Sequence, residues 1–147
     1  MTGIINVPQA SLTDLTGLPV LAFYGQKSGS TYAIPSTNVK ESFNPEYFSY
    51  DSTSRQFYCK KSFTGNIYVL ATSNMNAAGS SNYITYCRWR LYVNDSQYQN
   101  TGSTNSVGRY NTYNNVSFVA GGATYIQGYC YGNSRSGRGD FLYLVTL

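Results

Sequence analysis

The sequence predicts an all-β domain, an antiparallel sandwich or barrel of about nine or ten short strands. Short apolar or alternating runs recur along the 147 residues, and Gly, Pro, Asn, Asp and Ser separate them, as they do at turns. No stretch keeps a 3.6-residue apolar period over three turns, so helix is nearly absent. The 16 tyrosines and the small number of charged residues, 10 Lys and Arg against 6 Asp and Glu, exclude a disordered chain.

Turn residues delimit five predicted strands in the first half of the chain. Each run ends at glycine, at proline or at a turn rich in Ser, Thr and Asp. In chain order the strands are residues 20–24, 31–34, 47–50, 56–60 and 66–72. The first ends at Gly25, the second ends at Pro35, and the turn at residues 51–54 separates the third from the fourth.

The second half contains the longest predicted strand, residues 83–93, which Asn94 and Asp95 terminate. Its odd positions are apolar and suit a core, while its even positions form a mixed outward face. Residues 94–115 are rich in Asn, Ser, Thr, Gly and Tyr and predict loops with one poorly patterned strand. The remaining predicted strands and apolar runs are residues 106–113, 116–120, 124–131 and 140–147.

Two of these strands are apolar on both faces. In residues 66–72 the faces are Ile67, Val69 and Ala71 against Tyr68, Leu70 and Thr72, and in residues 140–147 they are Phe141, Tyr143, Val145 and Leu147 against Leu142, Leu144 and Thr146. Only one face of a sheet packs inward in a sandwich, so the second face needs another cover. With no helix to supply it, we expect other copies of the chain, since hiding one large apolar side chain contributes about 1.5–3 kcal/mol. The alternative is that these short strands lie in mid-sheet under loops.

Several fragments follow the first strand in a characteristic order. They are Phe57-Tyr58-Cys59, Phe63-Thr64-Gly65-Asn66-Ile67-Tyr68-Val69-Leu70, Leu91-Tyr92-Val93-Asn94-Asp95, Val116-Ser117-Phe118-Val119-Ala120-Gly121-Gly122 and Asp140-Phe141-Leu142-Tyr143-Leu144. With the opening run Val20–Tyr24, they make residues 20–147 resemble the globular q-type head of the first complement component, in the tumour-necrosis-factor-like jelly-roll superfamily. The matching patterns are "F-x-C, then G-x-Y-x-F", "L-x-x-N-G" and "F-x-G-x-L".

The resemblance implies a ten-stranded jelly roll that assembles as a compact trimer, with the first, last and central strands facing the three-fold axis. The sequence departs from the pattern at two positions. Ala123 follows Gly122 where the family usually has aspartate, and Tyr143 stands where a glycine is common. We therefore carry over no calcium site and expect no cofactor.

We expect two groups of head residues to make contacts. The trimer interface is predicted at Phe23, Tyr68, Leu70, Tyr125, Tyr129, Tyr143 and Leu144. An outward ligand surface is predicted at Tyr98, Tyr110, Tyr113 and Arg138, because Tyr with Ser, Gly and Asn gives adaptable contacts at low entropic cost. For the line of Tyr125, Gln127, Tyr129 and Tyr131, stacking on sugar rings is the alternative to lining the axis.

Residues 1–19 differ in composition from the head, residues 20–147, and are interpreted as a docking arm. They carry one charge, Asp14, together with two prolines and several Ser and Thr. Apolar residues along the arm give a partner something to hold: Ile4, Ile5, Val7, Leu12 and Leu15. A floppy terminus is the alternative. The chain begins at Met1 without a secretory leader or an apolar run long enough to span a bilayer, so we expect it to fold in the cytoplasm that made it.

The composition disfavours enzymes and metal sites. No histidine is present, which excludes Ser-His-Asp and Cys-His triads, and the six scattered acids leave little for a calcium or magnesium cage. The net charge of +4 is not clustered, so nucleic acid is not expected as a partner, although Arg88 and Arg90 share a predicted strand face with tyrosines. Cys59, Cys87 and Cys130 are expected as buried free thiols; a Cys87–Cys130 bridge is the alternative in an oxidising medium.

We interpret three short motifs as chance matches and not as functional sites. Residues 138–140 spell the integrin tripeptide Arg-Gly-Asp within a Gly/Ser-rich segment, and residues 94–96 and 115–117 fit the N-glycosylation pattern. Matches this short arise by chance.

The first hypothesis is a non-enzymatic structural or attachment protein on the surface of a virion, which we expect to be that of a bacteriophage. In it, a trimeric jelly-roll knob docks to a capsid, tail or fibre through residues 1–19 and presents its loops for host attachment, multiplying weak contacts by avidity. The second hypothesis is an extracellular ligand- or glycan-binding module of complement-head type.

Overall fold

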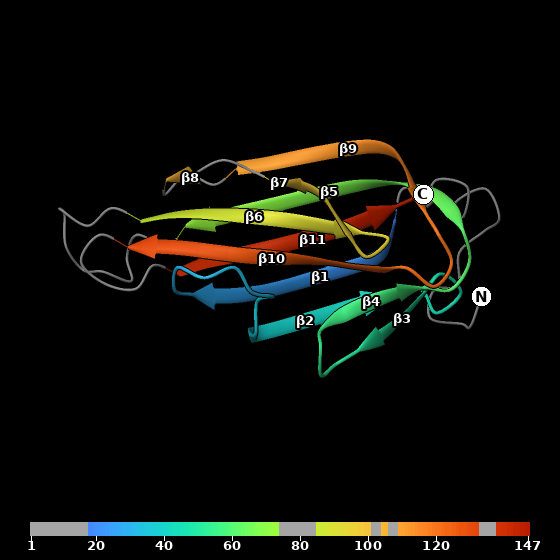
Figure 1. The fold of residues 1–147 in the computed structure, drawn as a ribbon, viewed down its shortest axis with the longest axis horizontal. Helices are drawn as coiled ribbons and strands as arrows, with labels where there is room; N and C mark the ends of the chain where they lie inside the picture. The colour runs from blue at the N-terminus through green and yellow to red at the C-terminus, as the bar shows by residue number, and fades with distance from the viewer. Residues whose placement is uncertain (1–17, 74–84, 101–103, 106–108, 133–137) are drawn as a thin grey trace, which may run out of the picture.

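The computed structural model describes residues 18–73, 85–100, 104–105, 109–132 and 138–147. In these residues the chain forms eleven β-strands and no helix, which confirms the all-β prediction. The strands are β1 Pro19–Ser28, β2 Thr37–Phe43, β3 Phe48–Asp51, β4 Gln56–Cys59, β5 Phe63–Ser73, β6 Thr85–Val93, β7 Ser96–Asn100, β8 Thr104–Asn105, β9 Arg109–Phe118, β10 Ala123–Gly132 and β11 Arg138–Thr146 (Figure 1).

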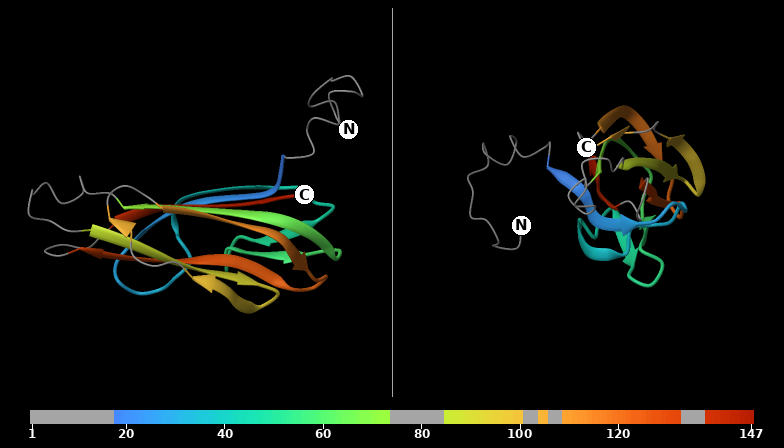
Figure 2. Two further views of the ribbon diagram at one scale, coloured as in Figure 1. Left: turned by 90° about the horizontal axis from the view of Figure 1, so that it is seen from above. Right: turned by 90° about the vertical axis from the view of Figure 1, so that its left-hand side faces the viewer.

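The strands form two antiparallel sheets that pack face to face as a sandwich (Figure 2). The five-stranded sheet has the order β2-β1-β11-β5-β9, and the six-stranded sheet has the order β3-β4-β10-β6-β7, with β8 paired to β6. The first and last strands, β1 and β11, pair over nearly their whole length, and β5 pairs with the other edge of β11. Three strands that are far apart in sequence therefore lie side by side.

Three polar strands were not predicted, namely β2, β7 and the two-residue β8, and one predicted strand is absent. β2 and β7 lack an apolar run because each is an edge strand whose side chains are largely exposed. β7 follows a two-residue turn in which Asn94 and Asp95 have φ values of 53° and 66°, typical of a tight hairpin. In the predicted strand at residues 31–34, only Ala33 pairs, as an isolated bridge to Gly128.

β9 is one strand where two separate segments were expected. Its pairing with β5 shifts between Gly65 and Ile67, next to Asn115, whose φ is 57°. The Asn115 backbone N–H is satisfied at this irregularity by the side-chain oxygen of Asn66, at 3.1 Å. The irregularity lets the strand continue, although its inward and outward pattern is interrupted.

The inner faces of both sheets build one hydrophobic core. The odd face of β6 was predicted to be inward, and Cys87, Trp89, Leu91 and Val93 are all buried. The end of the core near β3 and β4 is aromatic, where Phe48 makes edge-on contacts with Phe57, Phe63 and Phe118. Edge-to-face pairs add about 0.5–1.5 kcal/mol each beyond the area that they bury.

A buried polar chain crosses the core from one sheet to the other. The hydroxyl groups of Tyr143 in β11 and Thr124 in β10 are hydrogen-bonded, and Thr124 donates to the backbone carbonyl of Tyr92, at 2.7 Å. The Tyr143 side chain is therefore buried with its polar atom paired. Burial raises the pKa of Tyr143, so it stays neutral in the fold.

Gly128 gives a direct test of this packing. A Cβ atom at Gly128 would come within 2.7 Å of the Phe141 ring. We expect Gly128→Ala to lower the free energy of unfolding by about 1–3 kcal/mol, measured by urea denaturation, because the core has no room for the methyl group. In a Phe141→Leu background the same change should cost less, and an equal cost in both backgrounds would contradict the proposed clash.

Candidate functional site: two opposite sheet faces

The outer face of the five-stranded sheet carries an apolar grid, which we call the β1–β11–β5 face. It consists of Ala22, Tyr24, Leu142, Leu144, Tyr68 and Leu70. The register aligns them in two rows across the strands, one running from Tyr24 through Leu142 to Leu70 and the other from Ala22 through Leu144 to Tyr68. All six are half-buried although no layer of the described chain covers them. Cross-strand neighbours in such rows shield each other.

Two shallow hollows flank the Tyr24–Leu142 pair on this face. One opens toward β2 and is lined by Ala22, Lys40 and Ser42, together with that pair. The other opens toward β5 and is lined by Leu70, Thr72, Asp140 and the same pair. The face is thus uneven and mainly apolar, which is the relief that side chains of a partner can fill.

A polar cluster borders the grid at the start of β11. The Asp140 carboxylate accepts hydrogen bonds from the Tyr24 hydroxyl at 2.9 Å and from Gln26 Nε2 at 2.8 Å. Burial, and secondly the bond to Asp140, raise the pKa of Tyr24. The Arg138-Gly139-Asp140 tripeptide therefore lies in a paired strand, not in a loop, with Gly139 buried and the carboxylate engaged.

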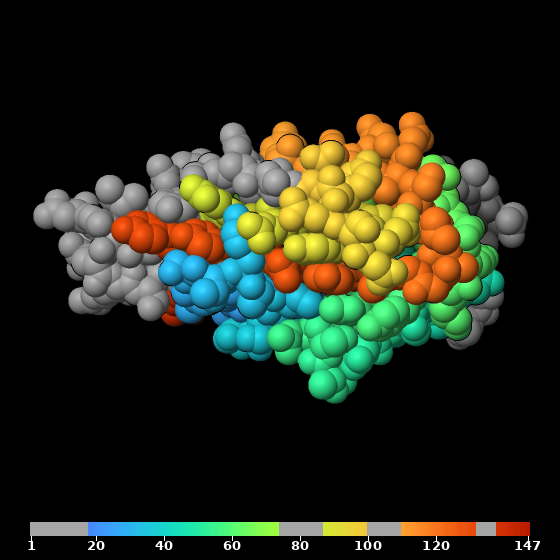
Figure 3. All heavy atoms as spheres, in the orientation of Figure 1, coloured from blue at the N-terminus to red at the C-terminus, as the bar shows by residue number. Residues whose placement is uncertain are grey.

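The outer face of the six-stranded sheet has a different chemistry, and we call it the β10–β6 face. It consists of Tyr125, Gln127 and Tyr129 from β10, Arg88, Arg90 and Tyr92 from β6, and Tyr32 from the segment that follows β1. The register pairs each β10 residue with one from β6: Tyr125 with Tyr92, Gln127 with Arg90, and Tyr129 with Arg88. Figure 3 views this side of the molecule, where β10 in orange-red runs across the middle and the yellow β6 and β7 lie above it, β6 being its paired neighbour.

Arginine and tyrosine side chains on the β10–β6 face stack on one another. The Arg90 guanidinium lies 3.6 Å from the centre of the Tyr32 ring, and Arg88 lies 5.6 Å from that of Tyr129. The Tyr92 and Tyr125 rings are parallel, with centres 4.6 Å apart, and Tyr92 donates to Gln127. Each guanidinium group thus lies within cation–π distance of a tyrosine ring, and Arg90 is paired with no carboxylate of the described residues on this face.

The seven residues predicted for a trimer interface do not share one surface. Tyr68, Leu70 and Leu144 lie on the β1–β11–β5 face. Phe23 and Tyr143 pair directly between β1 and β11 but point into the core, where they are 2% and 0% exposed. Because alternate strand residues face opposite ways, neither is available on the outer face of this chain.

The other two predicted interface residues, Tyr125 and Tyr129, lie on the opposite side of the sandwich, on the β10–β6 face. The predicted interface does not include Ala22, Tyr24 and Leu142, which lie on the β1–β11–β5 face. Leu142 could have been predicted from the sequence, since it is two residues from Leu144 in the last strand and therefore lies on the same face.

The four predicted ligand-surface residues do not form one exposed surface, although the Tyr98 and Tyr113 rings meet edge-on with centres 5.9 Å apart. Tyr98 and Tyr110 are exposed, but Tyr110 stacks on Tyr68 at the edge of the β1–β11–β5 face, with ring centres 5.6 Å apart. Tyr113 points inward and packs edge-on against Trp89. Arg138 is exposed at the start of β11. The predicted docking arm residues, Ile4, Ile5, Val7, Leu12 and Leu15, lie outside the described residues.

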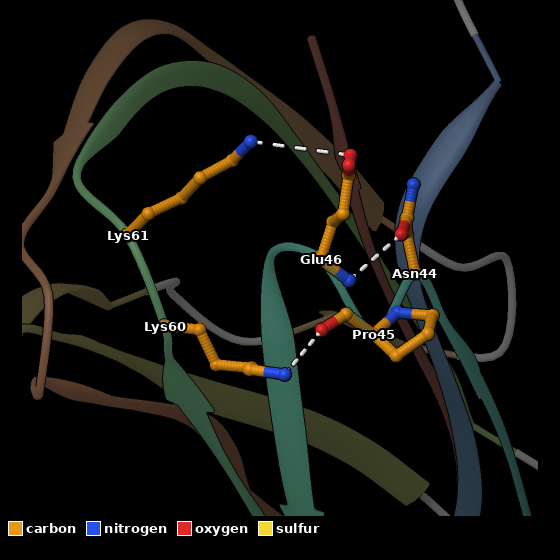
Figure 4. A network of polar contacts seen from close by, with 5 residues as sticks. All are labelled: Asn44, Pro45, Glu46, Lys60 and Lys61. Atoms are coloured by element: carbon orange, nitrogen blue, oxygen red, sulfur yellow. Dashed lines mark hydrogen bonds and ion pairs between the residues drawn. The ribbon is translucent and has the colours of Figure 1, made fainter.

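The acidic side chains of Glu46 and Asp51 have local structural partners. Figure 4 shows the turn between β2 and β3, where Glu46 lies 3.9 Å from Lys61, and the Pro45 carbonyl accepts from Lys60. Asp51 accepts from the backbone N–H groups of its own turn, and these bonds lower the pKa of its carboxyl group. Among the described residues, no three His, Cys, Asp or Glu side chains gather as metal ligands would.

No protein-family model matches the chain, and no curated protein matches it either. In the part of the chain that the structure describes, no helix has the length and apolar character to cross a membrane.

The tyrosine environment predicts a loss of stability in alkali. Folding raises the pKa of Tyr24 and Tyr143, so their contribution is complete below about pH 10, the pKa of an unfolded tyrosine, and is lost as the pH rises above it. We expect the free energy of unfolding, measured by urea denaturation, to fall between pH 10 and 12, and to fall less steeply in Tyr24→Phe. A stability that is constant or rises over this range would contradict the assignment.

Proposed function

We propose that the chain is a non-enzymatic trimeric structural protein of a virion, with a jelly-roll head and an N-terminal docking arm. The strand order supports the jelly roll, because both sheets combine strands from the two halves of the chain, as double Greek-key sandwiches do. The resemblance seen in the sequence implies that the first, last and central strands face the three-fold axis. β1, β11 and β5 are adjacent, which supports that arrangement.

The observation that carries the trimer is the apolar grid on the β1–β11–β5 face. Leu70, Leu142 and Leu144 stand on the outside of a sheet whose inner face is already packed. Covering a large apolar side chain contributes about 1.5–3 kcal/mol, so a few in each subunit sustain an obligate oligomer. A second copy matches this face in chemistry, since a closed ring buries the same apolar patch in every subunit.

The virion role rests on the sequence. A sparsely charged chain rich in Tyr, Asn, Ser and Gly, with a separate arm that carries scattered apolar residues, fits a particle-bound knob. Its docking partner would be a capsid, tail or fibre protein, and its outward ligand would be a host receptor or glycan. Three copies of each loop then act together, so weak individual contacts give firm attachment.

Two matched tyrosine variants test the interface. Tyr68 and Tyr125 are each half-buried, each stacked on another tyrosine, and on opposite faces of the sandwich. We expect Tyr68→Asp to convert the trimer to a 16.3 kDa monomer in sedimentation velocity, because a carboxylate would be buried at the interface. Tyr125→Asp should remain trimeric.

A wild-type monomer, or dissociation caused by Tyr125→Asp but not by Tyr68→Asp, would contradict the proposed interface. The arm is tested separately with residues 20–147 alone. This fragment should form the same trimer but should fail to co-sediment with virus particles that bind the full chain. Equal particle binding by both would remove the docking role of the arm.

The β10–β6 face favours a second candidate function, the binding of acidic glycans. Arg88 and Arg90 supply positive charge, the hydroxyl and amide groups of Tyr and Gln suit sugar hydroxyls, and the tyrosine rings offer apolar surface to a sugar ring. A trimer closed on the β1–β11–β5 face leaves this surface in solution, so the two functions are compatible.

Arg90 is the residue on which glycan binding should depend. We expect Arg90→Gln to weaken binding to polygalacturonate about tenfold or more in isothermal titration, since charge-assisted hydrogen bonds contribute about 1.5–3 kcal/mol. Lys40→Gln removes one exposed positive charge from the opposite sheet and should leave the affinity unchanged. Equal weakening by both variants, or equal binding to neutral dextran, would reject a specific acidic-glycan site.

A further inference from the structure

Two of the three cysteines face each other across neighbouring strands. Cys87 in β6 and Cys130 in β10 are directly paired in the register, and their Sγ atoms are 3.1 Å apart. Both side chains are 0% exposed. They lie at the end of the sandwich where β6 and β11 begin and where β1 and β10 end.

The backbone geometry at this pair suits a disulfide. The Cys130 N–H donates to the Gly29 carbonyl at 2.9 Å, so it points away from β6. Cys87 and Cys130 are therefore a non-hydrogen-bonded antiparallel pair, the kind in which the two Cα atoms are about 4.5 Å apart. That separation lies within the range of about 4.4–6.8 Å that disulfides span, so a bond needs little movement of either strand.

β11, in the opposite sheet, leaves room for the two sulfur atoms. Gly139 in β11 packs directly over them, and a Cβ atom there would clash with both Cys87 Sγ and Cys130 Sγ. The Cys87 thiol also lies within hydrogen-bonding reach of the backbone carbonyls of Thr72 and Arg138. The pair is thus enclosed by β5, β10 and β11 with no side chain placed between its sulfur atoms.

A buried cation acts on both thiols. The Lys27 side chain is 8% exposed, donates to the carbonyls of Ser28 and Gly29, and interacts electrostatically with Cys87 and Cys130. The hydrogen bond to Cys130, then burial and the charge of Asp140 raise the pKa of the Cys87 thiol, and Lys27 acts in the opposite direction. Lys27 is the positive group that favours a thiolate at this place.

We propose that Cys87 and Cys130 form a peroxide-reactive dithiol, which closes to a cross-strand disulfide with Lys27 as the residue that promotes it. One thiol loses its proton and its sulfur attacks a peroxide oxygen; the O–O bond breaks, giving a sulfenic acid and hydroxide, which takes up that proton to become water. The second sulfur then attacks the first, the S–O bond breaks and the S–S bond forms. The second thiol proton leaves with the sulfenic hydroxyl as another water. Two thiols are oxidised, and one hydrogen peroxide is reduced to two water molecules.

The bridge would join β6 to β10, the two strands that form the β10–β6 face. It closes a loop between positions 43 apart in sequence, which restricts the unfolded chain. We therefore expect the oxidised protein to melt about 5–15 °C higher than the reduced protein. The inference does not depend on trimer formation or on glycan binding.

Cys59 supplies an internal control. It is buried, and its thiol donates to the Lys61 carbonyl at 2.9 Å, with no other cysteine of the described chain beside it.

After treatment of the full chain with hydrogen peroxide, the intact mass should fall by two hydrogen atoms. Peptide mapping should find Cys87 joined to Cys130, and dithiothreitol should restore the original mass and melting temperature. Cys130→Ala should instead gain oxygen atoms at Cys87 and form no intramolecular bridge.

Lys27→Met tests the role of the cation. We expect it to slow disulfide formation about tenfold at pH 7 and to shift the pH at which the rate rises to higher values, while wild-type and variant disulfides have the same connectivity. An equal rate and pH profile would remove Lys27 from the proposal. Oxygen addition without a Cys87–Cys130 bridge in the wild-type chain, or a bridge that lowers the melting temperature, would overturn the dithiol itself.

Discussion

Three strands of the five-stranded sheet, β1, β11 and β5, carry apolar side chains on both of their faces. Strand residues alternate between faces, so the inward side chains of these three strands fill the core while the outward ones form a second apolar layer. A two-layer sandwich covers only the first of these layers. The three strands occupy the centre of the five-stranded sheet, where β2 and β9 flank but do not cover them. The proposed trimer follows because this outer apolar layer needs a cover that the described residues of one subunit do not provide.

The alternation of apolar and polar residues along single strands made much of the fold predictable, because in a half-buried strand every second residue faces the core. Trp89 and its neighbours in β6 were assigned correctly to the core for that reason. β2 and β7 lack this alternation, since edge strands with exposed polar side chains have the composition of loops. Their place in the sheets is set by hairpin geometry and by pairing with β1 and β6.

The candidate interface was predicted in part, because parity within a strand is readable from sequence but the relation between strands is not. Leu144 and Tyr68 reach the same face through a register that only the folded sheet defines. Tyr143 was predicted in the interface, whereas its side chain lies in the core with its hydroxyl paired to that of Thr124. The stacking of Arg90 on Tyr32 joins segments with no sequence relation. The outcome is a sandwich with one apolar and one arginine-tyrosine face, the first suited to other copies of the chain and the second to a ligand.

Hydroxyl-radical footprinting of the full chain reports the solvent exposure of individual side chains in the assembled state, and so it shows whether other copies cover the β1–β11–β5 face. We expect Leu142 and Leu144 to be protected in the wild-type protein and to become labelled in Tyr68→Asp, while Val119, which is 52% exposed, is labelled equally in both. The contrary result would be equal labelling of the two leucines in wild type and variant, at the level expected from their exposure in a single subunit. It would show that no other copy covers the β1–β11–β5 face.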